Sequence, residues 1–441
     1  MNFAVKHEIN KSFMREVSRE IEIPVVDLII KALNQISKKY HENTTILAVC
    51  PISISVVKSA LRSAKVFNAP IEFVATLNQV DLDGGYTKWT QRDFVKVVKE
   101  EAERISFKGP VMIALDHGGP WLKDRHVTEN WNLDEAMEGV KESLVASLTA
   151  GYDLLHIDAT VDKTLEKGET IKIETIVERT LDLMEYIEDF RRARALPKIS
   201  YEVGTEEVHG GFTSPDSFNK FLKDLKHGLS KRGLSDVWPC FIVGDVGTDL
   251  QTTIFDTVTA RNLVNIARKY KSYIKGHYTD YIRNLQDYPK VGMGGANVGP
   301  EFSGAEFDSL EELLNIEEGL VKEGRITASS KFKHVLTKSI TDSNRWKKWL
   351  LNSEKDKKFS QLPSYRRKWL LKTSSRYVWT EKAVTNARSK LYENLAINGI
   401  NGEEIVLQWI DGVMKKYFAC FNLKDSISKI EQELRRTKKP P

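Results

Sequence analysis

Short apolar segments and amphipathic stretches alternate along the chain from residue 46 to residue 298. Each apolar segment ends in small or polar residues, and the stretch that follows carries apolar side chains at helical spacing. This alternation predicts a parallel sheet, and eight strands predict its closure into a barrel. We therefore expect an α/β fold, specifically a (β/α)8 TIM barrel. The predicted strands are residues 46–53, 71–78, 111–115, 154–160, 198–204, 240–247, 273–280 and 288–298. The predicted helices between them are residues 56–65, 92–104, 133–150, 171–194, 217–232 and 257–271.

A doubly wound open sheet is the alternative architecture, but no Gly-x-Gly-x-x-Gly sequence follows the first predicted strand. Residues 281–287, between the last two predicted strands, leave room for only a stub of helix. After residue 305 the strand pattern ends, and helical stretches rich in aromatic residues follow. We expect residues 1–304 to form the barrel with an N-terminal helix, and residues 305–441 to form a helical C-terminal cap packed on it.

Composition excludes several classes of protein. The 441 residues are 41% hydrophobic and 29% charged, which is typical of a folded globular chain. The 66 basic and 61 acidic residues nearly balance, so the basic runs of the C-terminal third favour solvated helix faces over a nucleic-acid site. Three scattered cysteines exclude a disulfide framework, and no apolar run approaches the roughly 18 residues that span a bilayer. We expect a cytoplasmic protein that binds neither nucleic acid nor membrane.

The third predicted strand ends in an acid and a histidine, Asp116 and His117, followed by Gly118 and Gly119. Adjacent residues on an extended strand point to opposite faces. The pair therefore either serves two separate roles or reaches one site from a bent strand end. Carboxyl ends of barrel strands are where chemistry is placed, and glycines allow the backbone to turn sharply there.

Four of the nine histidines fall at predicted strand ends or in the loops that follow them: His117, His156, His209 and His277. Their convergence on one rim of a barrel predicts a divalent metal site. Surface roles are expected for the other five: His7, His41, His126, His227 and His334. Acids share the same rim, and the candidates are Asp116, Asp158, Glu202, Glu206 and Asp280. Imidazoles and carboxylates together could hold a cation and move protons next to a carbonyl group.

Two polar loops are candidates for substrate binding. Asn78 and Gln79 follow the second predicted strand, and their amides can bond sugar hydroxyls. A glycine-rich segment follows or forms the end of the last predicted strand, where barrels commonly bind phosphate. Its candidate residues are Lys290, Gly292, Gly294 and Gly295.

Seven short motifs occur in a recognisable order between residues 78 and 292. The motifs are Asn78-Gln-Val, Gly84-Gly-Tyr-Thr, Asp116-His-x-Gly-Pro, His156-Ile-Asp-Ala, Gly204-Thr-Glu, His277-Tyr-Thr-Asp-Tyr and Lys290-Val-Gly. This set resembles the class II tagatose-bisphosphate aldolase accessory-subunit family, GatZ/KbaZ.

The resemblance implies a barrel related to zinc-dependent class II aldolases. It assigns proton transfer to Asp116 and metal binding to His117, with His277 as the second ligand. The chain departs from the accessory pattern at Glu202 and His209, where the accessory proteins carry apolar residues. These extra groups would complete a metal site. The expected ligands are His117, His209, His277 and Glu206, with Glu206 alternatively an acid–base group.

Two hypotheses follow. The first is a metal-dependent ketose 4-epimerase, or a related aldolase, acting on tagatose and fructose or on their 6-phosphates by retro-aldol chemistry. Asp116 or Glu202 would take the proton of the C4 hydroxyl, and Asp158 and Asp280 would contact the substrate. Zinc is the expected ion, with Mn, Co and Ni as alternatives. The second hypothesis is a non-catalytic subunit that stabilises a partner aldolase; a homo-oligomer also fits.

Overall fold

The computed structural model describes residues 10–166, 169–204, 214–249 and 253–437. Eight parallel strands close into a barrel in the order of the chain, and β1 pairs with β8 to complete it. The (β/α)8 prediction is confirmed. The strands are β1 (Ile46–Val49), β2 (Ile71–Thr76), β3 (Val111–Gly118), β4 (Leu154–Ile157), β5 (Ser200–Gly204), β6 (Phe241–Val243), β7 (Tyr273–Gly276) and β8 (Gly295–Val298).

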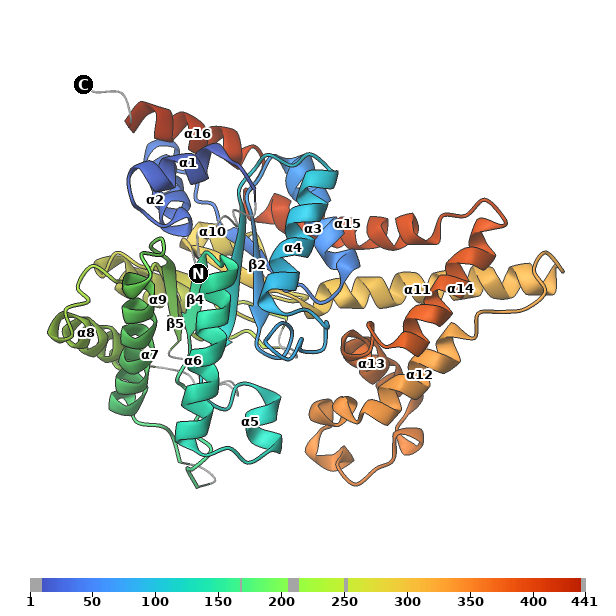
Figure 1. Ribbon diagram of the computed structural model, residues 1–441. Coiled ribbons are helices and arrows are strands. Elements are labelled where there is room, and N and C mark those ends of the chain that lie inside the picture. Colours follow the sequence, from blue (N-terminus) through green and yellow to red (C-terminus); the bar gives the residue numbers. More distant parts are fainter. Residues whose placement is uncertain (1–9, 167–168, 205–213, 250–252, 438–441) are drawn as a thin grey trace.

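Helices follow the strands and cover the outside of the barrel (Figure 1). They form because apolar side chains recur at helical spacing and polar caps begin them; Thr90 and Asp93, for example, make a reciprocal capping box at the start of α4. These helices are α3 (Ile54–Phe67), α4 (Gln91–Arg104), α5 (Asp124–Thr128), α6 (Leu133–Ala150), α7 (Ile173–Ala193), α8 (Pro215–Lys231), α9 (Thr257–Lys269) and α10 (Asp287–Val291).

Two N-terminal helices, α1 (Phe13–Glu20) and α2 (Val25–Tyr40), precede the barrel. The helix α2 lies against β5, and its Asp27 accepts a hydrogen bond of 2.6 Å from the hydroxyl of Ser200, the first residue of that strand. Since strands begin at the amino end of a parallel barrel, α2 covers that end. The chemistry expected at strand ends is therefore left to the opposite rim.

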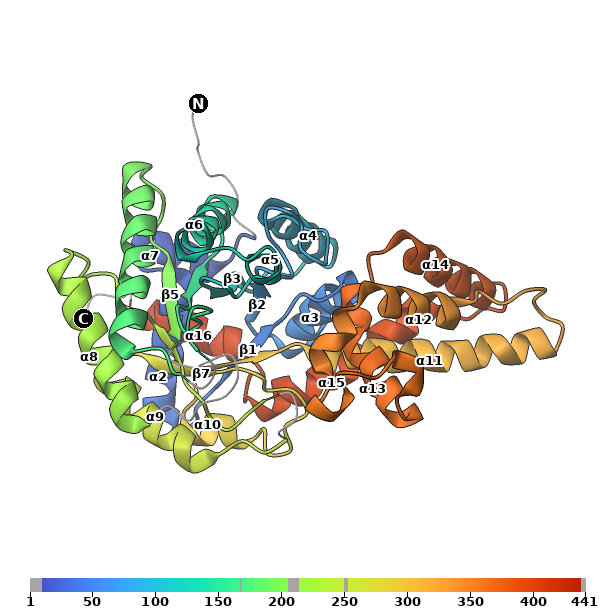
Figure 2. The ribbon, with the colours of Figure 1, turned by 90° about the horizontal axis from the view of Figure 1, so that it is seen from below.

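The C-terminal region is helical, as predicted. Its first helix starts at Pro300, directly after β8, so the expected division at residue 304 falls inside α11. Helices α11 to α14 extend to one side of the barrel (Figures 1 and 2), whereas α15 packs on α3 and α16 on α2. The α-helices are α11 (Pro300–Lys322), α12 (Phe332–Ser343), α13 (Ser364–Ser374), α14 (Lys382–Ala396), α15 (Gly402–Cys420) and α16 (Ser426–Thr437). Among the described helices, none combines the length and apolar character needed to cross a membrane.

The predicted eighth strand, residues 288–298, is wrong in its first half. Residues Asp287–Val291 form the short helix α10, and β8 begins only at Gly295. Pro289 supplies no backbone N–H for a sheet, and Gly292 ends the helix with a φ of +88°, which favours glycine. The glycine-rich segment therefore leads into the last strand instead of following it.

Candidate metal and active site

The carboxyl end of β3 is bent. Its register with β4 shifts between Leu115 and Gly118, and His117 has a φ of +51°, an uncommon value for a residue with a side chain. The bend brings both Asp116 and His117 to one site, which was the second of the two arrangements expected for this pair. Gly119 must be glycine, because a Cβ there would lie 1.4 Å from the carbonyl oxygen of Asp158.

Three imidazole rings meet at this rim. The ring centroid of His117 lies 5.1 Å from that of His156 and 4.8 Å from that of His277. Their neighbours are two buried acids, Asp116 from β3 and Glu202 from β5. Ligand atoms of Asp116, His156, Glu202 and His277 all lie within 4.8 Å of one another, as do those of His117, His156 and Asp158. The structure thus brings together side chains from β3, β4, β5 and the end of β7.

Carboxylates orient two of these rings. Asp158 Oδ2 lies 2.6 Å from His117 Nδ1, and Glu202 Oε1 lies 3.1 Å from His277 Nε2. An ionised carboxylate can only accept, so each ring donates an N–H to the acid, and in its neutral form the ring keeps a lone pair on its other nitrogen. Those two nitrogens, His117 Nε2 and His277 Nδ1, face one another at 3.2 Å. Two lone pairs at that distance require a proton or a cation between them.

The donor set fits a divalent metal. Two nitrogens bound tetrahedrally to zinc at about 2.0–2.1 Å lie about 3.4 Å apart, close to the separation of His117 Nε2 and His277 Nδ1. His156 Nε2 is buried and makes no hydrogen bond within the described part of the chain. Mixed imidazole and carboxylate ligands suit Zn, Mn, Co and Ni alike. The site therefore fits a metal ion, and its chemistry leaves the identity of the ion open.

Charges in the site favour an ionised acid next to protonatable rings. Burial raises the pKa of Asp116, but His117, His277 and His156 outweigh burial and hold it well below its usual range. Burial lowers the pKa of His117, whereas Asp116 and Asp158 raise it to about 10. Burial dominates at His277 and lowers its pKa. Asp116 is consequently ionised at neutral pH.

A buried lysine supports the cluster from inside the barrel. Lys275 on β7 donates to Glu202 Oε2 at 2.9 Å and to Glu72 Oε1 on β2 at 3.0 Å. All three side chains are at most 1% exposed. Lys275 and His277 outweigh burial and lower the pKa of Glu202 to about 2, while burial raises that of Glu72 to about 7. Glu202 is thus held ionised, with one oxygen on Lys275 and the other on His277.

The predicted site residues divide into several groups. Asp116, His117, Glu202 and His277 meet at the site, whereas Glu206 and His209 lie outside the described residues. Asp158 lies behind His117, where it orients the ring instead of facing a substrate.

Asp280 accepts backbone N–H groups of Gly299 and Glu301 at the start of α11. Asn78 donates through Nδ2 to the carbonyl oxygen of Leu122 and accepts the backbone N–H of Asp124 on Oδ1, and Gln79 Oε1 accepts the backbone N–H of Thr76.

The glycine segment does not reach this rim, so its expected role in phosphate binding here is wrong. Lys290, Gly292 and Gly294 precede β8 and therefore lie at the opposite, amino end of the barrel. Lys290 pairs with Asp287 in solvent. A Cβ on Gly295 would lie 3.1 Å from Cγ of Lys275, so this glycine leaves space for the buried lysine.

Two features of the candidate site were missed. His156 was recognised at a strand end but not assigned to the metal; its place on the strand next to Asp116 is the signal. Asn297 on β8 was not considered, yet its side-chain amide is buried and has no hydrogen-bond partner among the described residues. Since Gly295 faces the interior and side chains alternate along a strand, Asn297 faces inward too, one layer nearer the carboxyl rim.

His126, expected at the surface, is 1% exposed. Its ring stacks on Trp131 with centroids 4.7 Å apart, and its Nδ1 accepts the N–H of Trp121. Burial and the nearby Lys123 lower its pKa to about 4. The sequence could not show this because the tryptophans that cover the ring lie in loops around a very short helix.

This burial predicts a pH effect on stability. The folded state binds a proton on His126 less readily than the unfolded state, whose pKa is about 6.5. Stability should therefore fall as pH drops from about 6.5 to about 4, by up to about 3 kcal/mol. His126→Phe should lose this component, so the unfolding free energies of the two proteins, measured in urea at several pH values, should converge on acidification. A constant difference between them would contradict the assignment.

The closed barrel and the imidazole–carboxylate cluster at its carboxyl rim define a (β/α)8-barrel protein with a buried candidate metal site. Residues 30–436 match the family described as D-tagatose-1,6-bisphosphate aldolase subunit GatZ/KbaZ-like. The chain belongs to this family, and at this coarse level it is a class II aldolase-like protein.

Solved structures with this fold include a probable tagatose 6 phosphate kinase from Sinorhizobium meliloti 1021. It superposes with a TM-score of 0.69 at 21% identity, covering 85% of this chain and 100% of the other. A fructose-bisphosphate aldolase from Campylobacter jejuni gives a TM-score of 0.47 at 13% identity, covering 87% and 91%. The YdjI aldolase from Escherichia coli K12 gives 0.40 at 12% identity, covering 82% and 96%. The first likeness concerns the fold, and the other two superpositions are loose.

Proposed function

We propose that the protein is a metal-dependent ketose 4-epimerase that interconverts tagatose and fructose, or their 6-phosphates, by retro-aldol and aldol steps. The observation that carries the proposal is the pair of carboxylate-oriented rings, His117 and His277, whose free nitrogens face each other at 3.2 Å beside Asp116. A divalent cation bound there would polarise the substrate carbonyl and stabilise the negative charge that develops as the C3–C4 bond breaks.

Asp116 is the proton acceptor in this proposal. It is ionised, buried and within 3.8 Å of ring nitrogens of both His117 and His277. It takes the proton of the C4 hydroxyl as the C3–C4 bond breaks, leaving an enediolate fragment and an aldehyde fragment in the site. It returns the proton after the fragment has turned and been attacked on its other face. Release of the aldehyde before that step would be aldolase chemistry at the same residues.

The remaining groups position these residues. Asp158 and Glu202 fix which nitrogen of each ring is free, and Lys275 holds Glu202 in place. Removing partners of this kind typically costs about 10- to 100-fold in metal affinity or activity. Glu202 was also a candidate base, but both of its oxygens are engaged, so we assign proton transfer to Asp116 and positioning to Glu202.

A cationic side chain from the cap favours phosphorylated substrates. Arg376 is 6% exposed, and its Nη1 has no hydrogen-bond partner among the described residues. Cys50, which follows β1, is close enough to both Arg376 and Asp116 for their charges to shift the pKa of its thiol. A guanidinium with a free N–H near the strand ends suits the anionic end of a ketose 6-phosphate.

Arg376→Gln should therefore raise KM for fructose 6-phosphate by about tenfold or more, while KM for free fructose changes little. Steady-state kinetics on both sugars tests this, with Arg367→Gln, in the same region of the cap and partly exposed, as the matched control. Equal effects on the two sugars would show that Arg376 has a structural role only.

The alternative function is a non-catalytic subunit that stabilises an aldolase, and the description of the family as an aldolase subunit favours it. One experiment separates the two. The purified protein is incubated with tagatose, fructose and both 6-phosphates, with and without Zn, Mn, Co or Ni, and products are followed by NMR. Metal-dependent turnover supports the enzyme. A lack of turnover with every sugar and metal would contradict the enzyme proposal and would favour the stabilising role.

A further inference from the structure

A hollow lies at the amino end of the barrel, on the face opposite the metal site. It has a volume of about 720 Å³ and lies between α2 and the chain around the starts of β6 and β7. Cys240, Ser272 and Tyr273, which line it, stand at or just before the first residues of those strands. None of its lining residues belongs to the imidazole–carboxylate cluster. Its size is in the range of small-molecule sites, which is roughly 300–1,000 Å³.

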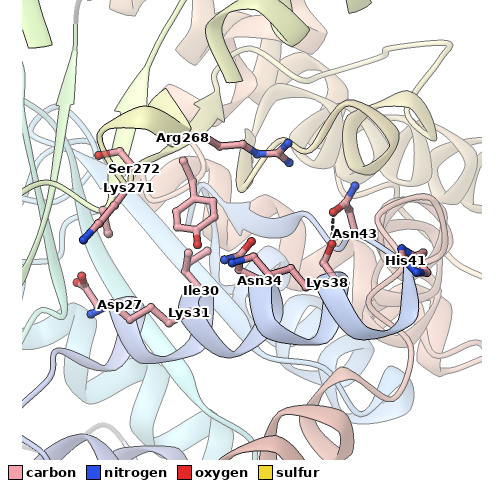
Figure 3. A pocket seen from close by; sticks show the side chains of 13 residues that line it. Asp27, Ile30, Lys31, Asn34, Lys38, His41, Asn43, Arg268, Lys271 and Ser272 are labelled. Carbon is pink, nitrogen blue, oxygen red and sulfur yellow. Dashed lines mark hydrogen bonds between the residues drawn. The ribbon is translucent and has the colours of Figure 1, made fainter. Parts of the chain in front are cut away.

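Positive charge dominates this hollow. Figure 3 shows Asp27, Lys31, Asn34 and Lys38 along α2, with Arg268 and Lys271 on the other side of the hollow. Four cationic side chains against one carboxylate leave an excess of three positive charges among the lining residues: Lys31, Lys38, Arg268 and Lys271 against Asp27. Within the described part of the chain, none of the four cations makes an ion pair. Neutralising them therefore falls to solvent ions or to a ligand.

The guanidinium group of Arg268 lies against the glycine segment. A Cβ on Gly292 would lie 2.2 Å from a terminal nitrogen of Arg268, so the guanidinium lies directly over backbone that carries no side chain. Gly292 also has a φ of +88°, which glycine adopts most readily. The glycine-rich segment, which the sequence suggested as a phosphate site at the carboxyl rim, thus forms part of a cationic hollow at the amino end of the barrel.

Neutral groups add hydrogen-bonding capacity. Asn34 and Tyr273 line the wall, and the hydroxyl of Ser37 donates to Asn43 Oδ1, which fixes that amide at the edge. Guanidinium and ammonium groups with amide and hydroxyl neighbours are the surroundings that bind phosphate esters. An aromatic ring in the wall adds a flat apolar surface for the rest of such a molecule.

We propose that this hollow binds a small organic phosphate that carries two or more negative charges, such as a nucleotide or a sugar bisphosphate, at a site separate from the catalytic rim. The bound anion would join α2 to the end of α9 by bridging Lys31 or Lys38 to Arg268. It would hold α2, the helix that covers the amino end of the barrel, against the barrel. This binding is independent of the reaction proposed above.

Isothermal titration calorimetry on the full chain tests the proposal with ATP, fructose 1,6-bisphosphate, pyrophosphate and, as a neutral probe, adenosine. At least one of the phosphates should bind with Kd below about 1 mM, and adenosine should not. The double variant Arg268→Gln/Lys271→Gln should weaken binding about tenfold or more. Both residues are exposed, so the variant should fold, and circular dichroism checks this. The phosphate with the lowest Kd shows whether the site prefers a nucleotide or a sugar phosphate.

Two controls keep the result specific. Lys269→Gln removes an exposed lysine of α9 that does not line the hollow, and it should bind as the unaltered protein does. His277→Ala alters the catalytic rim and should leave this binding intact. Affinity should fall as salt rises from about 0.05 M to about 0.5 M. Absence of binding by every phosphate, equal binding by the double variant, or loss of binding in His277→Ala would each overturn the proposal.

Discussion

His277→Ala should abolish turnover and strip the protein of its metal. The substitution removes one of two facing nitrogens and leaves Glu202 Oε1 without its ring partner. Loss of an outer partner of a metal ligand alone costs about 10- to 100-fold, so loss of the ligand itself should weaken metal binding at least about a hundredfold. Turnover should fall by about a thousandfold or more, because proton transfer and metal polarisation act together. Metal content per chain and kcat are the measurements.

His117→Ala should behave in the same way, since its Nε2 is the other facing nitrogen. His227→Ala is the matched control, because His227 is exposed on α8 far along the chain from the rim. Circular dichroism should show that all three variants stay folded. Near-normal metal content and rate in His117→Ala or His277→Ala would place the reaction elsewhere in the molecule.

Lys275→Met should be the most destabilising single change among the residues discussed. It shortens the unbranched side chain by only one atom but leaves Glu72 and Glu202 buried together without a cation. Removing one partner of a buried ion pair typically costs about 3–5 kcal/mol. The unfolding free energy from urea titration should fall by that amount.

A partial rescue separates charge from packing. Lys275→Met combined with Glu72→Gln removes one uncompensated carboxylate and should recover part of the loss. Lys290→Met removes a lysine that is 67% exposed and should change stability by less than about 0.5 kcal/mol. If Lys275→Met unfolds at the same urea concentration as the unaltered protein, the buried pair contributes nothing to stability.

The barrel could be predicted because its cause is local. Apolar runs indicate seven of the strands, and helical periodicity indicates the helices between them. Both patterns involve only residues that are neighbours along the chain. The two glycines after His117 signalled a bent strand end, and the structure has that bend. The eighth strand failed because Tyr288, Val291 and Met293 give an apolar run, while Pro289 and Gly292 set a short helix instead.

The site could be predicted only in part, for a different reason. Strand ends converge in any parallel barrel, so Asp116, His117 and His277 could be grouped from their positions. The contacts between individual side-chain atoms could not be predicted from these positions. Asp158 turned out to orient His117, and Lys275, within an ordinary apolar strand, pairs with acids on two other strands across the interior. Such contacts depend on which residues of different strands face the barrel interior at the same level along the barrel axis.

The direct test of the central claim is the metal content of the purified protein set beside its turnover of fructose 6-phosphate. We expect about one divalent ion per chain, loss of turnover on chelation, and recovery when Zn, Mn, Co or Ni is added back. A protein that holds no ion after incubation with any of these metals, or that turns the sugar over equally well in excess chelator, would contradict the account.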